Sequence, residues 1–223
     1  MEADVRTATT GGLGSIGALA ICGLAAGPLF LSSSIIQGLT RDGFDLAHQP
    51  VSFLSLGQLG WMERSTFIAA GALVVTFAIG ILRARGQGGH RLEALFLLLT
   101  GLGVIIAGLF PPDAGFGYPV GTPDGRPETI TYHSHMHGLG FTLSFVSFVL
   151  ACIVNIRFAA RNHAWRRVTY TSVSALAALA LALTPGTSGI AIRNLLAAVI
   201  LWAWITQRAY ISLDPSRPRA AAD

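Results

Sequence analysis

Three histidines occupy alternate positions in residues 131–140, TYHSHMHGLG, directly before a long apolar run. A helix turns about 100° per residue, so His133 and His137 are predicted on one side of a helix, about 5–6 Å apart. His135 is predicted to face another direction. One helix commonly supplies two zinc ligands at this spacing, and a neutral imidazole can equally act as a general base. The segment therefore predicts a metal site, an acid–base site, or simply the polar end of a transmembrane helix in the headgroup zone.

Further polar side chains are predicted at the same level of the molecule. Asp113, in GLFPPDAG, ends the apolar run that precedes the histidines. Asp45, His48 and Ser52 lie in the connection after the first apolar run. A zinc ion bound by Asp113 and the histidine pair would activate a water molecule for hydrolysis. Without a metal, Asp113 would donate a proton and a histidine would remove one. The predicted cofactor is therefore zinc or none.

The elements that position these residues are predicted to lie in a membrane. Of the 223 residues 52% are hydrophobic and only 12% are charged, whereas soluble domains have about 25% charged residues. A spanning helix needs about 20 mostly apolar residues. The prediction is an all-α polytopic membrane protein, a six-helix bundle forming a single domain over 1–223 with two long extracytoplasmic loops. The predicted helices are about 13–36, 66–83, 92–110, 132–154, 168–184 and 189–207.

The arrangement of the arginines predicts how the chain crosses the membrane. The leader before the first apolar run is not basic and that run is longer than a signal peptide requires, so we expect a first transmembrane helix. All basic residues are arginines, and only Arg41, Arg64, Arg126 and Arg193 are predicted on one side of the membrane. The positive-inside rule then places both termini in the cytoplasm of a bacterial inner-membrane protein. This charge pattern excludes a nucleic-acid partner.

Two long connections, 38–64 and 111–130, are rich in Gly and Pro, and such loops are usually functional. Within the first, PVSFLSLGQLGW is too apolar for water and too short to span, so it is predicted to be interfacial or re-entrant, with Trp61 among the lipid headgroups. We expect Glu63 and Arg64 to be headgroup anchors.

The remaining candidates are predicted to contact a substrate or the membrane interface. Trp202 and Trp204 are expected to belong to an aromatic belt near the cytoplasmic side. Arg193 either extends toward headgroups or pairs with an outer carboxylate such as Asp113. The residues expected to bind a substrate are Asp45, Trp61, Phe110, Tyr132, Phe141 and Arg193.

Three segments in order, HQPVSFLSLGQLGWMER, GLFPPDAG and YHSHMHGLGF, resemble the bacterial and archaeal membrane-protein family catalogued as domain of unknown function 998. The resemblance runs from the first outer loop through the last helix and implies the same architecture. It places the family's Ser, Asp and His positions at Ser52, Asp113, His133 and His137. It implies no general activity.

These observations leave two classes of function open. The first is an intramembrane enzyme that acts on a hydrophobic, lipid- or prenyl-like substrate in the outer leaflet, by metal-assisted hydrolysis or by acid–base isomerisation or cyclisation. Its catalytic candidates are Asp113, His133, His137, Ser52 and His48. The second is a non-enzymatic protein that binds a lipid or small molecule or serves as an accessory subunit. A transporter fits less well, because several predicted helices lack polar residues at their midpoints. The sequence leaves the oligomeric state open.

Overall fold

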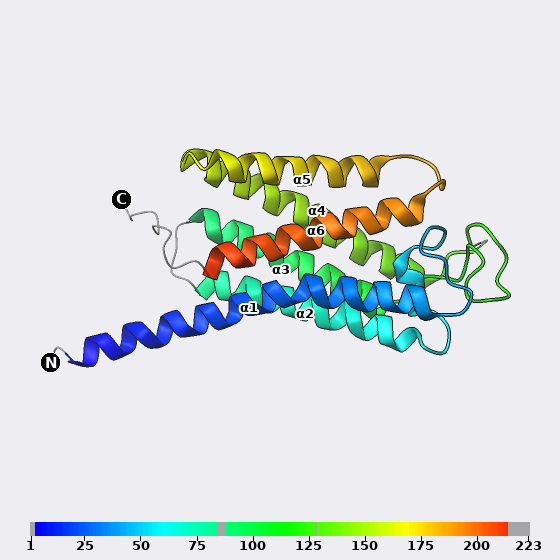
Figure 1. Cartoon of the computed structure of the whole chain (residues 1–223), viewed down its shortest axis with the longest axis horizontal. Coiled ribbons are helices and arrows are strands. Elements are labelled where there is room, and N and C mark those ends of the chain that lie inside the picture. The colour runs from blue at the N-terminus through cyan, green and yellow to red at the C-terminus, as the bar shows by residue number, and fades with distance from the viewer. Residues whose placement is uncertain (1–2, 84–87, 128, 214–223) are drawn as a thin grey trace.

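The computed structural model describes residues 3–83, 88–127 and 129–213, and its helices run roughly along one common axis (Figure 1). The described residues form no β-strand, and the predicted all-α architecture is confirmed. The elements are α1 (Ala3–Thr40), the short 3₁₀ helix η1 (Val51–Ser55), α2 (Gly60–Arg83), α3 (Gly88–Leu109), α4 (Tyr132–Arg161), α5 (Trp165–Leu183) and α6 (Ile190–Leu213).

Five of the six α-helices contain a stretch that is long and apolar enough to cross a membrane. The sixth, α5, packs against α4 and α6 but is less apolar, because Arg166 and Arg167 lie in its first turn. Its membrane crossing stays a prediction. The five stretches are Leu19–Thr40, Gly60–Arg83, Arg91–Leu109, Tyr132–Arg161 and Ile190–Leu213.

Several helices extend beyond their predicted ends. Helix α2 begins at Gly60 rather than at residue 66, α4 ends at Arg161 rather than at 154, and α6 ends at Leu213 rather than at 207. The apolar run marks only the part of a helix that can lie in hydrocarbon. The backbone hydrogen-bond ladder continues into polar residues on either side, which hydropathy does not mark.

Helix α3 lies between α2 and α4, and glycines allow close contact on both of its sides. A Cβ atom on Gly101 would lie 2.7 Å from the carbonyl oxygen of Gly71 on α2. A Cβ atom on Gly103 would lie 2.6 Å from the carbonyl oxygen of Gly140 on α4. Small residues at such crossings bring helix backbones together and allow dense packing in a membrane. The position of His137 relative to the end of α3 depends on this close contact.

The two tryptophans of α6 belong to the core, so the prediction that they form an aromatic belt is wrong. Trp204 is fully buried and its ring lies 5.6 Å from that of Phe148. Trp202 is 3% exposed and its ring lies 5.0 Å from that of Phe30 on α1. Helix α6 packs against both α1 and α5, which encloses these positions.

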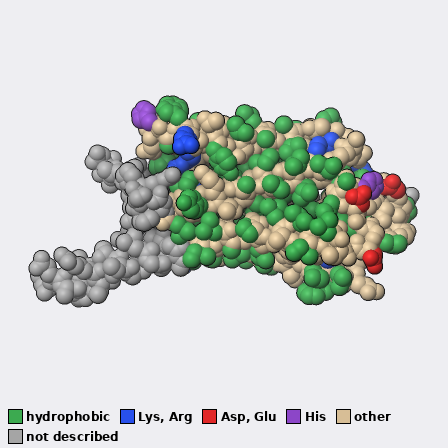
Figure 2. Space-filling model, viewed as in Figure 1, with side chains coloured by type: hydrophobic (Ala, Val, Ile, Leu, Met, Phe, Trp, Pro, Cys, Tyr) green, Lys and Arg blue, Asp and Glu red, His purple; other side chains and the backbone are tan. Residues whose placement is uncertain are grey.

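The first described residues of α1 and the last of α6 lie at the same end of the bundle (Figure 1). The connections 41–59, 110–131 and 184–189 lie at the other end, here called the loop end. Figure 2 shows hydrophobic side chains over the middle of one face, while the acidic side chains visible on that face gather at the loop end.

The apolar segment of the first connection packs against the helices instead of lying free at the membrane surface. It forms η1, which contacts α1, α2 and α6. Leu54 is fully buried, and Val51 and Phe53 are also buried. Trp61, at the start of α2, is 63% exposed, as a residue among headgroups would be.

Candidate functional site

The site begins with the C-terminal end of α3, where two prolines interrupt the helix. Pro111 and Pro112 have no N–H groups, so they cannot donate to the carbonyl oxygens of Ala107 and Gly108 four residues earlier. The last carbonyl groups of any helix need partners from elsewhere. At this helix end, side chains from the two neighbouring helices provide them.

Arg64 of α2 and His137 of α4 bind these carbonyl groups. Arg64 donates to the carbonyl oxygens of Gly108 and Leu109, at 3.3 and 3.2 Å. The Nδ1 atom of His137 lies 2.9 Å from the carbonyl oxygen of Ala107 and 2.9 Å from that of Phe110. Arg64 is therefore a helix cap, and the prediction of a headgroup anchor is replaced by this role.

These contacts fix the orientation of the His137 ring. Carbonyl oxygens only accept hydrogen bonds, so Nδ1 must carry the proton. In the neutral ring the other nitrogen, Nε2, then holds a lone pair, and it has no hydrogen-bond partner among the described residues. The ring is partly buried and lies 6.3 Å from the ring of Phe67 on α2. A histidine fixed through one nitrogen by a backbone carbonyl presents the other to a proton or a ligand.

Asp113 anchors the start of α4. Its carboxylate accepts hydrogen bonds from the backbone N–H of Thr131 at 2.8 Å and from the Thr131 hydroxyl at 2.7 Å. The Ser134 hydroxyl lies 3.3 Å from the backbone nitrogen of Asp113. Partial burial alone would raise the pKa of Asp113, but the bonds from Thr131 and Ser134 and the charge of His135 outweigh it, so the pKa lies below its ordinary value of 3.8.

This arrangement favours an ionised Asp113, which accepts hydrogen bonds and does not donate a proton. The charge of His135, which is predicted on a different side of the helix from His133 and His137, makes the smallest contribution to this lowering of the pKa. The pKa of Asp113 is lower in the folded protein than in the unfolded chain. The ionised carboxylate therefore stabilises the fold at pH values above the pKa of the unfolded chain, and this stabilisation is lost as the pH falls through the pKa of the folded protein.

Replacing Asp113 with asparagine is expected to reduce the free energy of unfolding at neutral pH by about 1–3 kcal/mol. The neutral amide of asparagine would replace the charged carboxylate that accepts both hydrogen bonds from Thr131. The difference between wild type and Asp113→Asn should shrink as the pH falls below 3.8. Thermal unfolding across this pH range measures it, with the exposed Asp42→Asn as control. A difference that stays constant with pH would rule out the anchoring role.

The predicted zinc site remains a prediction. His133 is exposed, and its ring packs 5.7 Å from that of Phe110 and 6.1 Å from that of Tyr132. His137 uses Nδ1 for backbone carbonyls, and both oxygens of Asp113 already accept hydrogen bonds from Thr131. In the described part of the chain no three His, Cys, Asp or Glu side chains are grouped so that they could hold a metal ion.

Hydrogen bonds join the connection 41–59 to the connection that follows α3, away from Asp113 and His137. His48 Nε2 lies 2.9 Å from the Asp124 carboxylate, and both side chains are exposed. Contact with His48 holds the pKa of Asp124 below its ordinary value. Gln49 donates to the carbonyl oxygen of Phe116 at 2.7 Å. Asp45 accepts from the N–H of Ala47 at 2.8 Å, which is a local turn contact. His48 and Gln49 therefore join the two connections, the Asp45 carboxylate stays within its own turn, and neither His48 nor Asp45 forms a hydrogen bond with Asp113 among the described residues.

The other candidates have separate positions. Ser52 is half-buried and forms none of the hydrogen bonds found among the described side chains. Arg193 donates to the carbonyl oxygens of Gly186 and Ser188, each at 2.7 Å, so it closes the turn before α6. Phe141 is 46% exposed and stacks on Phe145 along α4. Of the predicted substrate contacts, the structure gathers Phe110 and Tyr132 beside His133.

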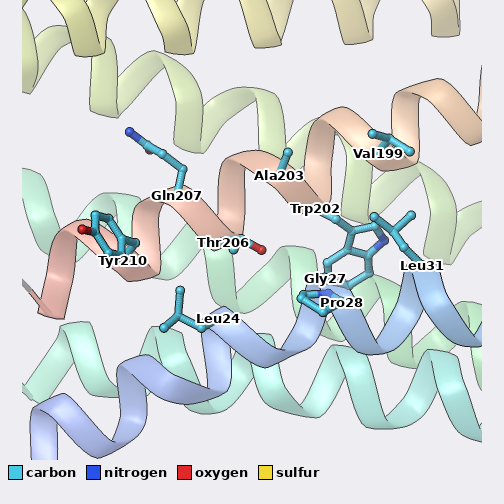
Figure 3. A pocket seen from close by; sticks show the side chains of 10 residues that line it. All are labelled: Leu24, Gly27, Pro28, Leu31, Val199, Trp202, Ala203, Thr206, Gln207 and Tyr210. Carbon is cyan, nitrogen blue, oxygen red and sulfur yellow. The ribbon is translucent and has the colours of Figure 1, made fainter.

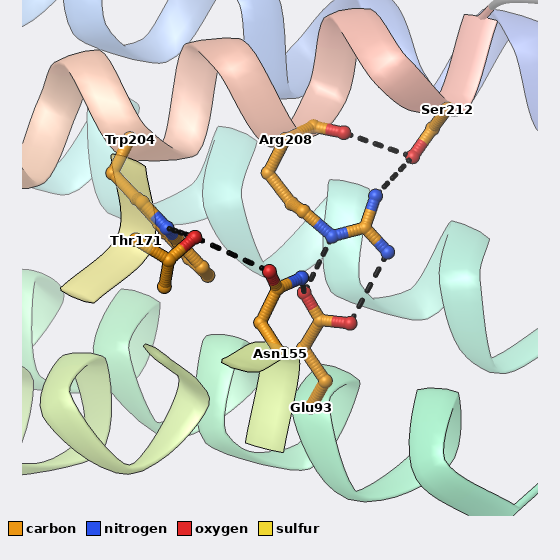
Figure 4. Close-up of polar contacts among 6 residues, drawn as sticks. All are labelled: Glu93, Asn155, Thr171, Trp204, Arg208 and Ser212. Carbon is orange, nitrogen blue, oxygen red and sulfur yellow. Dashed lines mark hydrogen bonds and ion pairs between the residues drawn. The ribbon is translucent and has the colours of Figure 1, made fainter. Parts of the chain in front are cut away.

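A buried polar network that was not predicted from the sequence lies near the opposite end of the bundle; Figure 4 shows its side chains. Arg208 of α6 forms an ion pair with Glu93 of α3, with N–O distances of 2.5 and 3.1 Å. Asn155 donates to Glu93 at 2.9 Å, and Thr171 of α5 donates to Asn155 at 3.3 Å. Trp204 donates to Thr171 at 3.2 Å. A charged residue inside a predicted span, Glu93, was the available signal.

A groove of about 490 Å³ lies between α1 and α6 (Figure 3). Its walls include Gly27 and Pro28 on α1 and Trp202, Ala203 and Thr206 on α6. Figure 3 shows the Thr206 side chain directed toward α1. Except for a few polar groups such as the Thr206 hydroxyl, the lining is apolar, so the groove suits a hydrocarbon chain.

Residues 24–209, well over half of the chain, match the family described as "Protein of unknown function (DUF998)". The matched range includes Pro111 and Pro112 at the end of α3 and the histidine segment 131–140. No curated protein and no solved structure matches the chain.

Proposed function

This chain belongs to the family of proteins of unknown function DUF998, and we propose that it is an intramembrane acid–base enzyme that acts on a lipid- or prenyl-like substrate. The proposed base is Nε2 of His137 at the loop end. The single observation that supports this role is the pair of 2.9 Å contacts from Nδ1 to the carbonyl oxygens of Ala107 and Phe110.

Those contacts prepare the ring for proton transfer. The proton on Nδ1 is held by the backbone, so the lone pair of Nε2 has a defined direction and no competing partner among the described residues. In the proposed isomerisation, a proton taken up from water adds to one carbon of a substrate double bond and leaves a cationic centre on the neighbouring carbon. Nε2 then removes a proton from the carbon on the other side of that centre, and the C–H electron pair becomes the new double bond. The imidazolium then passes the proton to water. This step occurs in both isomerisation and cyclisation of prenyl chains.

The surrounding side chains suit such a substrate. Phe67 lies against His137, and Phe110 and Tyr132 form an aromatic group with His133. Aromatic faces stabilise a nearby cation by about 0.5–2 kcal/mol. The metal-assisted hydrolytic form receives less support, because the hydrogen bonds of Asp113 already use both of its oxygens.

The proposed enzyme has a defined orientation in the membrane. Among the described residues, Arg41, Arg64, Arg126 and Arg193 lie at the loop end, and the more numerous other arginines lie toward the opposite end. By the positive-inside rule, the loop end faces away from the cytoplasm of a bacterial inner membrane. His137 would then meet substrates from the outer leaflet.

The experiment uses the purified full chain in vesicles of bacterial lipid extract with added prenyl lipids, incubated in D₂O. A proton transfer through His137 should introduce deuterium into a lipid, which mass spectrometry detects even when isomerisation leaves the composition unchanged. Vesicles without protein provide the background. Deuterium levels equal to this background in every lipid class would contradict the proposal, and cleaved lipids without deuterated carbon would indicate the hydrolytic form.

A second candidate function is binding of a lipid chain without chemistry, which the groove between α1 and α6 favours. Ala203→Phe should fill the groove and remove most labelling of α6 by a phospholipid with a photoactivatable acyl chain. The control Ala180→Phe, at an exposed position of α5, should leave labelling unchanged. Mass spectrometry of the labelled peptides measures the effect, and equal labelling of the two variants would exclude the groove.

A further inference from the structure

A buried carboxyl group lies near the loop end, in the first turn of α2. Glu63 is 0% exposed, so it is not the headgroup anchor expected from the sequence. Its two oxygens accept hydrogen bonds from the Ser34 hydroxyl at 2.7 Å and from the Gln37 amide at 2.6 Å. Both donors are neutral and belong to α1. Among the described residues no Arg or His nitrogen lies within 4.0 Å of the carboxylate.

A charged carboxylate in this position would be costly. Moving a carboxylate from water into a protein interior is strongly unfavourable unless a cation is paired with it. Ionisable groups in membrane spans are rare, and they commonly mark sites that move protons or ions. A proton bound to Glu63 removes the charge and preserves contact with both donors.

The nearest positive charge is used elsewhere. The Arg41 guanidinium donates to the Gln37 side-chain oxygen and to the carbonyl oxygens of Leu54 and Leu59, and so holds the segment that contains η1. The Nε atom of Arg41 is buried without a partner. The hydroxyl of Ser55, the residue after Leu54, is also buried and unpartnered. Gln37 therefore separates Arg41 from Glu63, and the guanidinium retains an unused donor.

The other ionisable side chains near Glu63 contact groups other than its carboxylate. Arg64, the next residue on α2, donates to α3 carbonyl groups. His137 of α4 lies against Phe67, one turn farther along α2. Arg41 is the charge that acts on Glu63.

We propose that Glu63 is a proton-binding site whose occupancy controls how the segment Leu54–Leu59 is held. With the proton bound, Arg41 remains on the two backbone carbonyl groups. When the acid O–H bond breaks and the proton leaves to water, the carboxylate attracts Arg41, which then releases the segment. This proposal is independent of the chemistry assigned to His137.

Infrared spectroscopy of the full chain in vesicles tests whether the proton is bound. The difference spectrum between wild type and Glu63→Gln at neutral pH should contain the C=O stretching band of a protonated carboxylic acid. Ser34→Ala keeps the carboxyl group and removes one of its hydrogen bonds, so it should shift this band; Asp113→Asn should leave it unchanged. The Ser34→Ala comparison decides the outcome even if Glu63→Gln fails to fold.

Hydrogen exchange tests the coupling to the segment. Amide protection of Leu54–Leu59 should fall as the pH rises in wild type, after correction for the intrinsic exchange rate, and should stay constant in Glu63→Gln. Absence of the acid band at neutral pH would overturn the proton site. Protection that changes equally in both proteins would overturn the control of the segment. Neither result depends on lipid turnover, so this proposal and the enzyme proposal can fail separately.

Discussion

Replacing Arg208 with methionine is expected to lower the free energy of unfolding by about 3–5 kcal/mol. The guanidinium lies in the core, 5% exposed, and pairs with Glu93, which is 1% exposed. Methionine fills similar space but removes the guanidinium that pairs with the buried Glu93 carboxylate. The network through Asn155 and Thr171 connects α3, α4, α5 and α6, so the whole bundle should be affected (Figure 4). Unfolding with increasing SDS in mixed micelles measures this energy.

Two further variants show whether the loss comes from breaking the Arg208–Glu93 ion pair. Arg157→Met removes an exposed arginine of α4 and should change stability by no more than about 0.5 kcal/mol. The double variant Glu93→Met with Arg208→Met removes both charges and should recover much of the lost stability. If Arg208→Met behaved like Arg157→Met, the buried ion pair would not hold the bundle together.

The second large effect concerns activity. His137→Asn is expected to lower deuterium transfer to lipid by about 10²–10⁴-fold, the usual contribution of a general base. The asparagine amide can reach the place of Nδ1 and donate to the Ala107 and Phe110 carbonyl groups, so stability should change little. His137→Ala removes this donor as well and should also cost about 1–3 kcal/mol of stability.

His133→Asn is the matched comparison one turn earlier on α4. His133 has ring contacts with Phe110 and Tyr132 but makes no hydrogen bond among the described residues, so a much smaller loss of turnover is expected. Equal losses from the two variants would favour joint action of the histidines, as at a metal. Full turnover in His137→Asn would remove His137 from the chemistry.

The helices could be predicted because hydrocarbon imposes a simple length rule. Runs of about 20 apolar residues identify spans regardless of what packs on them. Helix ends were less predictable, since residues such as those from Gly60 to Ser65 are held helical by contacts that hydropathy does not record. Trp204 shows the same limit: its type suits an interface, and only the packing of α6 against its neighbours buries it.

The sequence predicted that Asp113 and His137 belong to the candidate site, but it did not predict what their side chains contact. Asp113 and His137 do lie at neighbouring helix ends, yet each contacts backbone across an interhelical boundary. Pro111 and Pro112 indicate that the last carbonyl groups of α3 receive no hydrogen bond from the backbone that follows. The sequence does not show which side chains donate to them instead. Arg208 and Glu93 are 115 residues apart, so their pairing depends on how the helices pack. Glu63 near a helix start is equally consistent with an exposed anchor and a buried acid.

Nitrogen NMR of the full chain with isotope-labelled histidine in lipid nanodiscs shows which nitrogen of His137 carries the proton. The His137 signal is identified by its loss in His137→Asn. We predict a protonated Nδ1 and an unprotonated Nε2 at neutral pH, because the Ala107 and Phe110 carbonyl groups require a donor at Nδ1. A proton on Nε2 with none on Nδ1, or protons on both nitrogens at neutral pH, would contradict the assignment of His137 as the base.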